Sequence, residues 1–151
     1  MANTGEMTLT RTIYEAYAKN RLELLDSVFH PDVVLNSSGA WGVVGLDALK
    51  EWLASFHASF APRIDLVDEF IAGDRALVTI NQHWHHVGKD FFGIKPTGES
   101  GTSVEIFILW LRDGKVAQMN VADNTLDLAK YILEKGFEAP RGIEPPAIVK
   151  G

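Results

Sequence analysis

The segment from Arg75 to Val87 carries the side chains best suited to chemistry, and its alternating pattern predicts a β-strand. One face of this strand holds a mostly apolar set, namely Val78, Ile80, Gln82, Trp84 and His86. The other face holds the more polar set, Leu77, Thr79, Asn81, His83 and His85, which we expect to face solvent or a partner subunit. The first set predicts a pocket wall, with Trp84 as an apolar plate and with Gln82 and His86 as polar anchors.

His86 is a candidate for proton transfer, because an imidazole titrates near neutral pH. A hydrogen-bonded structural histidine near a strand end is an equally good explanation. The run from His83 to His86 also suggests a metal site, since histidines two apart on a strand can share one ion. No histidine follows His86, so the ligand set is incomplete and we expect no metal.

Asp123, directly after the last predicted strand, is the leading acid/base candidate. At the mouth of an apolar cone a carboxylate is partly desolvated, which raises its pKa toward the range useful for proton transfer. It could then remove a proton next to a carbonyl group and return it elsewhere. Alternatively, Asp123 caps a helix that begins near Asn124 or Thr125, because Asp is a favoured N-cap.

Further side chains are predicted to bind the ligand. Asn36 could donate a hydrogen bond to a carbonyl oxygen, although an ordinary turn residue is the commoner explanation. Tyr17 and His57 lie on the apolar stripes of predicted helices, where each could reach a cavity or pack in the core. Trp41, in a glycine-rich segment, could cover a cavity entrance or fill the core.

Hydrophobic spacing and breakers predict the elements that would position these residues. Three helices are expected first, at Glu6 to Lys19, Arg21 to Phe29 and Leu46 to Phe60. A short strand at Val33 to Leu35 and a loop at Asn36 to Gly45 separate the second helix from the third. Four strands then follow, at Arg63 to Ala72, Arg75 to Val87, Ser103 to Arg112 and Val116 to Ala122. A short helix is expected at Leu126 to Leu133.

This order predicts an α+β fold in which a curved antiparallel sheet wraps around three N-terminal helices, giving a cone-shaped barrel with an internal pocket. Tight turns at Gly73-Asp74 and Asp113-Gly114 join the long strands in pairs. We expect a single domain over residues 1–135, with residues 136–151 as a C-terminal tail without regular structure.

Composition limits the partners. The 151 residues carry a net charge of −6 and no basic cluster, which argues against a nucleic-acid partner. Apolar runs are too short to cross a bilayer, and the N-terminus has no secretory signal, so a cytoplasmic protein is expected. The sequence has no cysteine, no glycine-rich phosphate loop and no dinucleotide fingerprint, so we expect chemistry without a cofactor.

Several motifs fall in a familiar order between Asp74 and Asp123. They are His86-Val87-Gly88, Phe91-Phe92-Gly93-Ile94-Lys95-Pro96-Thr97-Gly98, Asp113-Gly114-Lys115-Val116 and Val121-Ala122-Asp123. With these motifs the chain resembles the SnoaL-like polyketide cyclase group (predicted ester cyclase-like) of the nuclear transport factor two-like superfamily. The resemblance extends more loosely to Tyr14-Glu15-Ala16-Tyr17 and to the segment from Phe29 to Val34.

The resemblance implies a polyketide cyclase-like or isomerase/lyase-like enzyme, working by acid/base chemistry on a buried, largely apolar small molecule. Asp123 matches the family's catalytic aspartate, and a homodimer through the sheet is expected. The studied cyclases also use a histidine on the third long strand, whereas Val104 to Leu111 has no histidine and only Glu105 as an ionisable residue. A non-catalytic small-molecule binder and a protein-interaction module of the same fold remain alternatives.

Overall fold

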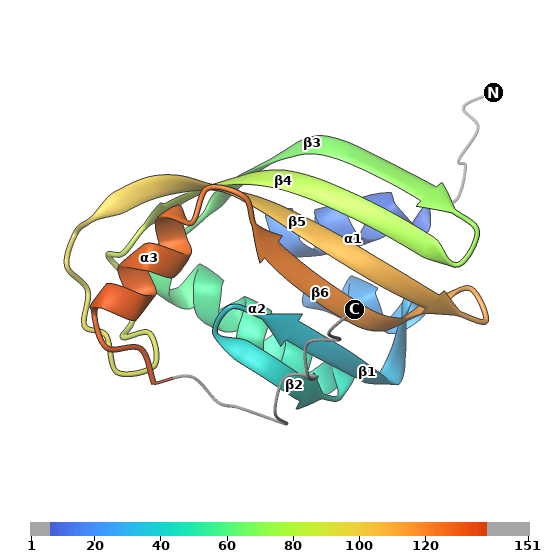
Figure 1. The fold of residues 1–151 in the computed structure, drawn as a ribbon, viewed down its shortest axis with the longest axis horizontal. Helices are drawn as coiled ribbons and strands as arrows, with labels where there is room; N and C mark the ends of the chain where they lie inside the picture. Colours follow the sequence, from blue (N-terminus) through green and yellow to red (C-terminus); the bar gives the residue numbers. More distant parts are fainter. Residues whose placement is uncertain (1–6, 139–151) are drawn as a thin grey trace, which may run out of the picture.

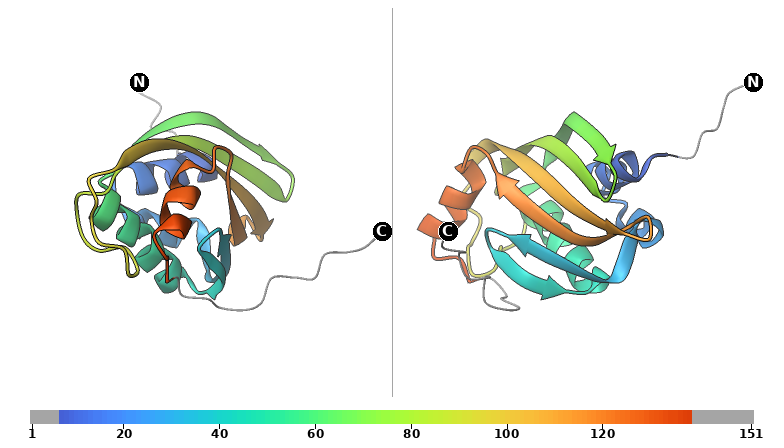
Figure 2. Two further views of the ribbon diagram at one scale, coloured as in Figure 1. Left: turned by 60° about the vertical axis from the view of Figure 1, so that its left-hand side comes forward. Right: turned by 45° about the vertical axis from the view of Figure 1, so that its right-hand side comes forward.

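The computed structural model describes residues 7–138, and six strands in this range form one curved, unclosed sheet (Figures 1 and 2). The strand order is β2-β1-β6-β5-β4-β3. The strands are β1 (Phe29–Ser37), β2 (Ala40–Val44), β3 (Arg63–Ala72), β4 (Arg75–His85), β5 (Ser100–Arg112) and β6 (Lys115–Asp123). The helices are α1 (Leu9–Ala18), the 3₁₀ helix η1 (Leu22–Ser27), α2 (Leu46–Phe60) and α3 (Asp127–Glu134). The predicted α+β class is confirmed.

The sheet arches over α1 and α2, and α3 lies at one end of it beside the loop that joins β4 to β5 (Figure 2). The core fills the space between the inner sheet face and the two long helices. Helix α2 is buried through the stripe that its spacing predicts, including Leu49, Leu53 and Phe60. It ends at Ala61, which adopts a φ of 40° just before Pro62, as expected of a residue that terminates a helix.

Four sequence expectations need correction. The segment Asn36 to Gly45, expected as a loop, contains the strand β2, and β1 is longer than predicted. Strand β2 is short and contains glycine, so its pairing with β1 holds it extended more than its own propensity does. The predicted second helix is a 3₁₀ helix, and Phe29 already belongs to β1. The sheet is also not wholly antiparallel, because β1 runs parallel to β6.

The alternation predicted along β4 is confirmed. Val78, Ile80, Gln82 and Trp84 are buried, while the residues between them are half-buried or exposed. Both predicted turns join their strands as expected, at Gly73-Asp74 and at Asp113-Gly114. Residues 136–138 have neither helix nor strand, and the rest of the predicted tail, like Glu6, lies outside the described residues. None of the helices within residues 7–138 has the length and apolar character needed to span a bilayer.

Candidate active site

A cavity of about 50 Å³ lies between the inner face of the sheet, helices α1 and α2, and helix α3. This is room for one or two water molecules, so a larger ligand requires the lining side chains to move. Its apolar lining is Tyr17, Trp52, Leu53, Phe56, Phe107, Val121, Leu128, Ala129 and Ile132. Its polar lining is Ser37, Ser38, Gly39, Gln82, Glu105 and Asp123. Among the described residues that line it there is no Lys, Arg or His.

Glu105 is the most unusual side chain in this cavity. Alternation along β5 places it on the inner face between Ser103 and Phe107, where it is only 8% exposed. Burial, and to a lesser degree the nearby charge of Asp123, raises the pKa of Glu105 to about 8. Within residues 7–138 no hydrogen bond reaches its carboxyl group. At neutral pH this group is mostly protonated, and it becomes a base only slightly above neutrality.

Asp123 lies directly opposite Glu105 in the pairing of β5 with β6. Its Oδ1 accepts hydrogen bonds from the backbone N–H of Thr125 at 2.9 Å and of Leu126 at 2.7 Å. Its Oδ2 accepts a longer bond, 3.4 Å, from the N–H of Ala129 in α3. Asp123 thus holds the turn that leads into α3, although the N-cap of this helix is Leu126 and not Asp123, and it also lines the cavity. The same carboxylate therefore joins α3 to the site.

Gln82 and Tyr17 form the other polar part of the cavity. The Tyr17 hydroxyl donates a hydrogen bond to Gln82 Oε1. Because the Gln82 carbonyl is occupied, its NH₂ group is the part available to a ligand. Burial, and secondarily the charge of Glu105, raises the pKa of Tyr17, so its hydroxyl stays a donor across the working pH range. Of the side chains predicted to bind the ligand, Tyr17 and Gln82 line the cavity.

His57 contacts Tyr17 and does not line the cavity. Its Nε2 donates to the Tyr17 backbone carbonyl at 2.6 Å, and its ring meets the Tyr17 ring edge-on at 5.3 Å. Burial lowers the pKa of His57, which favours the neutral ring. His57 therefore fixes α1 against α2 and orients Tyr17, without being among the lining residues.

Ser37 was missed by the sequence reasoning, which singled out its neighbour Asn36. Both polar atoms of the Asn36 side chain form hydrogen bonds within the sheet. Oδ1 accepts from the Gly42 N–H at 2.8 Å, and Nδ2 donates to Asn120 Oδ1 at 3.0 Å. Ser37 instead lines the cavity, is 8% exposed, and its Oγ is buried with no hydrogen-bond partner in the described part of the chain. The alternation of β1 could have indicated this one-residue difference.

His86 lies outside the cavity, fully buried beyond the end of β4. Its Nε2 donates to the Lys89 carbonyl at 3.1 Å, and in the neutral ring Nδ1 then accepts from the Tyr131 hydroxyl at 2.7 Å. The Tyr131 hydroxyl in turn accepts from Thr97 Oγ1 at 2.8 Å. The structure therefore does not bring His86 and Asp123 into one cavity. His86 connects the β4–β5 loop to α3.

Two predicted tryptophans also lie away from the cavity. Trp84 packs between Phe60 and Tyr131, and its indole N–H donates to Asp127 Oδ2 at 3.2 Å. Trp41 is half-buried in β2. Of the wall predicted from β4, only Gln82 reaches the cavity, because the sheet curves and α3 covers the end that carries Trp84.

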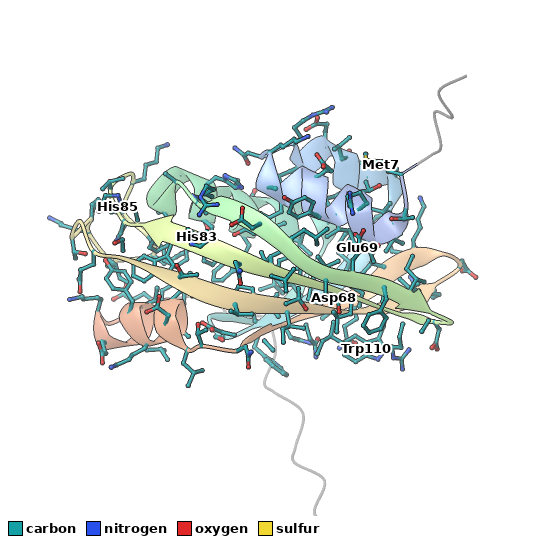
Figure 3. The ribbon with its side chains drawn as sticks, turned by 90° about the horizontal axis from the view of Figure 1, so that it is seen from above. Met7, Asp68, Glu69, His83, His85 and Trp110 are labelled. Carbon is teal, nitrogen blue, oxygen red and sulfur yellow. The ribbon has the colours of Figure 1, made fainter. Side chains whose placement is uncertain are left out.

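The histidine run does not converge on a point. His83 lies on the outer face of the sheet, where it bonds to Asp65 Oδ2 at 3.0 Å and to Thr102 Oγ1 at 2.9 Å (Figure 3). His85 is exposed and bonds to the Gly98 carbonyl, whereas His86 is buried on the other side. In the described residues no group of three His, Cys, Asp or Glu side chains is arranged to hold a metal ion.

The curved, unclosed sheet over two long helices, with a cavity at its inner face, defines the cone-shaped α+β class of nuclear transport factor two-like proteins. Within this class the chain belongs to the SnoaL-like domain family, whose model matches residues 10–119. The matched range includes Glu105 and ends before Asp123. No curated protein matches the chain in sequence.

Solved structures agree on the fold at low sequence identity. TsrD from Streptomyces laurentii is 20% identical with a TM-score of 0.68, over 81% of this chain and 90% of that one. A candidate SnoaL-like polyketide cyclase from Jannaschia sp. CCS1 is 15% identical with a TM-score of 0.69, over 81% and 89%. A protein of ketosteroid isomerase-like fold from Catenulispora acidiphila, solved with trimethylamine, is 14% identical with a TM-score of 0.62, over 87% and 96%.

Proposed function

We propose that the protein is a cofactor-free enzyme that moves a proton on a small, largely apolar molecule, as a cyclase, isomerase or dehydratase. Glu105 is the group that takes and returns the proton. The observation that carries the proposal is its burial: a carboxyl group with a pKa of about 8 faces a cavity and has no cationic partner in it. A pKa near the working pH is what general acid/base catalysis requires.

The proposed reaction begins at a carbon next to a carbonyl group. Ionised Glu105 removes a proton from that carbon, and negative charge develops on the carbonyl oxygen. The Gln82 NH₂ group and the Ser37 hydroxyl are the donors in the cavity that can stabilise this oxygen. Protonated Glu105 then returns the proton to another carbon, to an oxygen after ring closure, or, in a dehydration, to the departing hydroxyl group, which leaves as water. Asp123 holds the proton affinity of Glu105 high and orients α3.

A small carbon acid tests this proposal without knowledge of the natural substrate. Nitroethane exposes an acidic C–H beside a nitro group, whose oxygens replace the carbonyl oxygen. We expect the protein to accelerate exchange of this hydrogen in D₂O, followed by NMR. The rate should rise with pH and level off above the pKa of Glu105, about 8, because the ionised form is the base.

Variants separate Glu105 from its surroundings. Glu105→Gln should slow the exchange by about 100-fold, the lower range for loss of a general base. Asp123→Asn should move the midpoint of the pH profile down, because Asp123 raises the pKa of Glu105. Glu51→Gln, an exposed change on α2, is the matched control and should leave the rate unchanged. Equal rates for the wild type and Glu105→Gln would refute the proposal.

A non-catalytic binder is the second candidate, and the small size of the cavity favours it, because a polycyclic substrate requires the lining side chains to move. In that case the cavity holds a small molecule and the exchange rate stays at the level of the buffer.

A further inference from the structure

The cavity has a one-sided charge composition. Two carboxyl groups, Glu105 and Asp123, line it, and no basic side chain of the described chain does. They stand opposite each other on adjacent strands, and they repel each other when both are ionised. A bound anion would add to this repulsion in a poorly solvated space, whereas a bound cation would relieve it. The charge of the cavity therefore excludes carboxylates and phosphates as ligands.

The walls of the cavity suit a cation as well. Four aromatic side chains line it, namely Tyr17, Trp52, Phe56 and Phe107. The face of an aromatic ring attracts an ammonium group through its negative quadrupole, and the attraction grows when water is excluded. At long range the net charge of −6 also favours the approach of cations.

A buried hydroxyl group without a hydrogen-bond partner is the independent sign of a ligand. Ser37 Oγ is buried without a partner in the described residues, on a side chain that is only 8% exposed. Glu105 is equally buried and has no hydrogen bond to its carboxyl group within residues 7–138. Buried polar groups are normally satisfied, so Ser37 Oγ requires a partner that the described chain does not provide, and the Glu105 carboxyl group lines the same cavity. An ammonium group brings up to three N–H donors to such acceptors.

We infer that the cavity binds the protonated amine of a small aliphatic ligand, with the ammonium group beside Glu105, Asp123 and Ser37 and its carbon skeleton against the aromatic walls. The inference rests on the proposed function in one respect, since it places the substrate in the same cavity. It adds the substrate class: an amine that is protonated at neutral pH. Binding converts Glu105 to its ionised form, which is the form that removes a proton.

Three molecules with one carbon skeleton test the charge preference: isopropylammonium, 2-propanol and isobutyrate. Titrations at pH 7 are followed by the backbone amide shifts of Val121 and Ala129, which line the cavity. We expect isopropylammonium to bind at least about tenfold more tightly than 2-propanol, which is about 1.4 kcal/mol. Isobutyrate should bind more weakly than both. Equal or tighter binding of 2-propanol or isobutyrate overturns the inference, as does the absence of any binding by isopropylammonium.

Proton release is the second measurement, and activity does not enter into it. With a pKa of about 8, most Glu105 carries a proton at pH 7 before the amine binds. Calorimetry in buffers of different ionisation enthalpy should detect release of about one proton per amine bound. No release should accompany the binding of 2-propanol. Amine binding without proton release would contradict the placement beside Glu105.

Variants complete the test. Glu105→Gln should weaken isopropylammonium binding by about tenfold or more and abolish the proton release, while 2-propanol binding stays within about twofold. Asp123→Asn, which keeps the side-chain oxygen that holds the turn before α3, should also weaken isopropylammonium binding. Glu51→Gln should leave this binding unchanged. Amine binding with no acceleration of nitroethane exchange would refute the proposed enzyme and leave this inference standing. Nitroethane exchange activity without a preference for the amine would refute this inference and leave the proposed enzyme standing.

Discussion

At the scale of single residues, the site depends on one carboxyl group whose proton is held by its surroundings. Glu105 has a pKa of about 8 in the folded protein, against 4.5 for an ordinary Glu. The folded state therefore binds a proton that the unfolded state releases between these two values. Its contribution to stability is fully present below the unfolded pKa and is lost as the pH rises through about 8.

This linkage predicts a pH-dependent free energy of unfolding. For the wild type it should fall between about pH 5 and pH 9, by up to about 4 kcal/mol, since each tenfold change in proton affinity is worth about 1.4 kcal/mol. Glu105→Gln cannot ionise, so its curve should be flatter and should lie above that of the wild type at the alkaline end. Guanidinium denaturation of both proteins across this range measures the difference. Parallel curves for the two proteins would show that Glu105 ionises without penalty.

At the scale of elements, α3 is held over the cavity by polar contacts at both of its ends. Asp123 binds the first turn, and the Tyr131 hydroxyl links its second half to Thr97 and His86. Leu128, Ala129 and Ile132 of this helix line the cavity, so its position sets the cavity's size. His86 is thus a positioning residue in this arrangement, and it acts through Tyr131 and α3.

Removing the Tyr131 hydroxyl should loosen this helix. Tyr131→Phe leaves the Nδ1 atom of fully buried His86 without its donor, which should cost about 1–3 kcal/mol of unfolding free energy. Hydrogen exchange of the α3 amides should become faster than in the wild type, more than exchange in β4. Thr97→Val, which removes the exposed end of the same relay, is the control and should cost less. An unchanged α3 would mean that packing alone holds the helix.

Elements with strong local signals were the ones that the sequence could predict. Helix α2 and strand β3 begin and end where spacing, Pro62 and the Gly73 turn place them. Strand β2 was missed because its extended form comes from pairing with β1. The bond from Asn36 to Asn120 joins residues 84 apart in the sequence, so local patterns could not predict it either. In the site, too, local patterns predicted some residues and the tertiary structure decided the others. Alternation found Gln82, whereas the curvature of the sheet decided that Trp84 and His86 lie elsewhere.

At the scale of the whole molecule, no helix covers the outer face of the sheet (Figures 1 and 3). Register places four apolar side chains of β5 there, Val104, Ile106, Ile108 and Trp110, each half-buried in the single chain. Leu77 of β4 lies beside Ile108. Toward the other end the face becomes polar, with the His83–Asp65 pair. A face with an apolar centre and a polar rim is suited to a protein interface.

We propose that two copies of the chain pair through this face, centred on Ile106 and Ile108. A two-fold axis would bring each of these side chains near its own equivalent, as isologous interfaces do.

Ile108→Glu then buries two like charges in one interface, so the dimer should dissociate while the far-ultraviolet circular dichroism stays the same. Val44→Glu, at an exposed site on the β2 edge, is the matched control and should leave the dimer intact. Light scattering after size exclusion gives the mass of each variant. A monomeric wild type, or a dimer that survives Ile108→Glu and dissociates with Val44→Glu, would place the interface elsewhere or remove it. Because Ile108 is on the opposite face of β5 from Glu105, a dimer through this sheet does not cover the cavity on the inner face, and the two sites should bind their ligands independently.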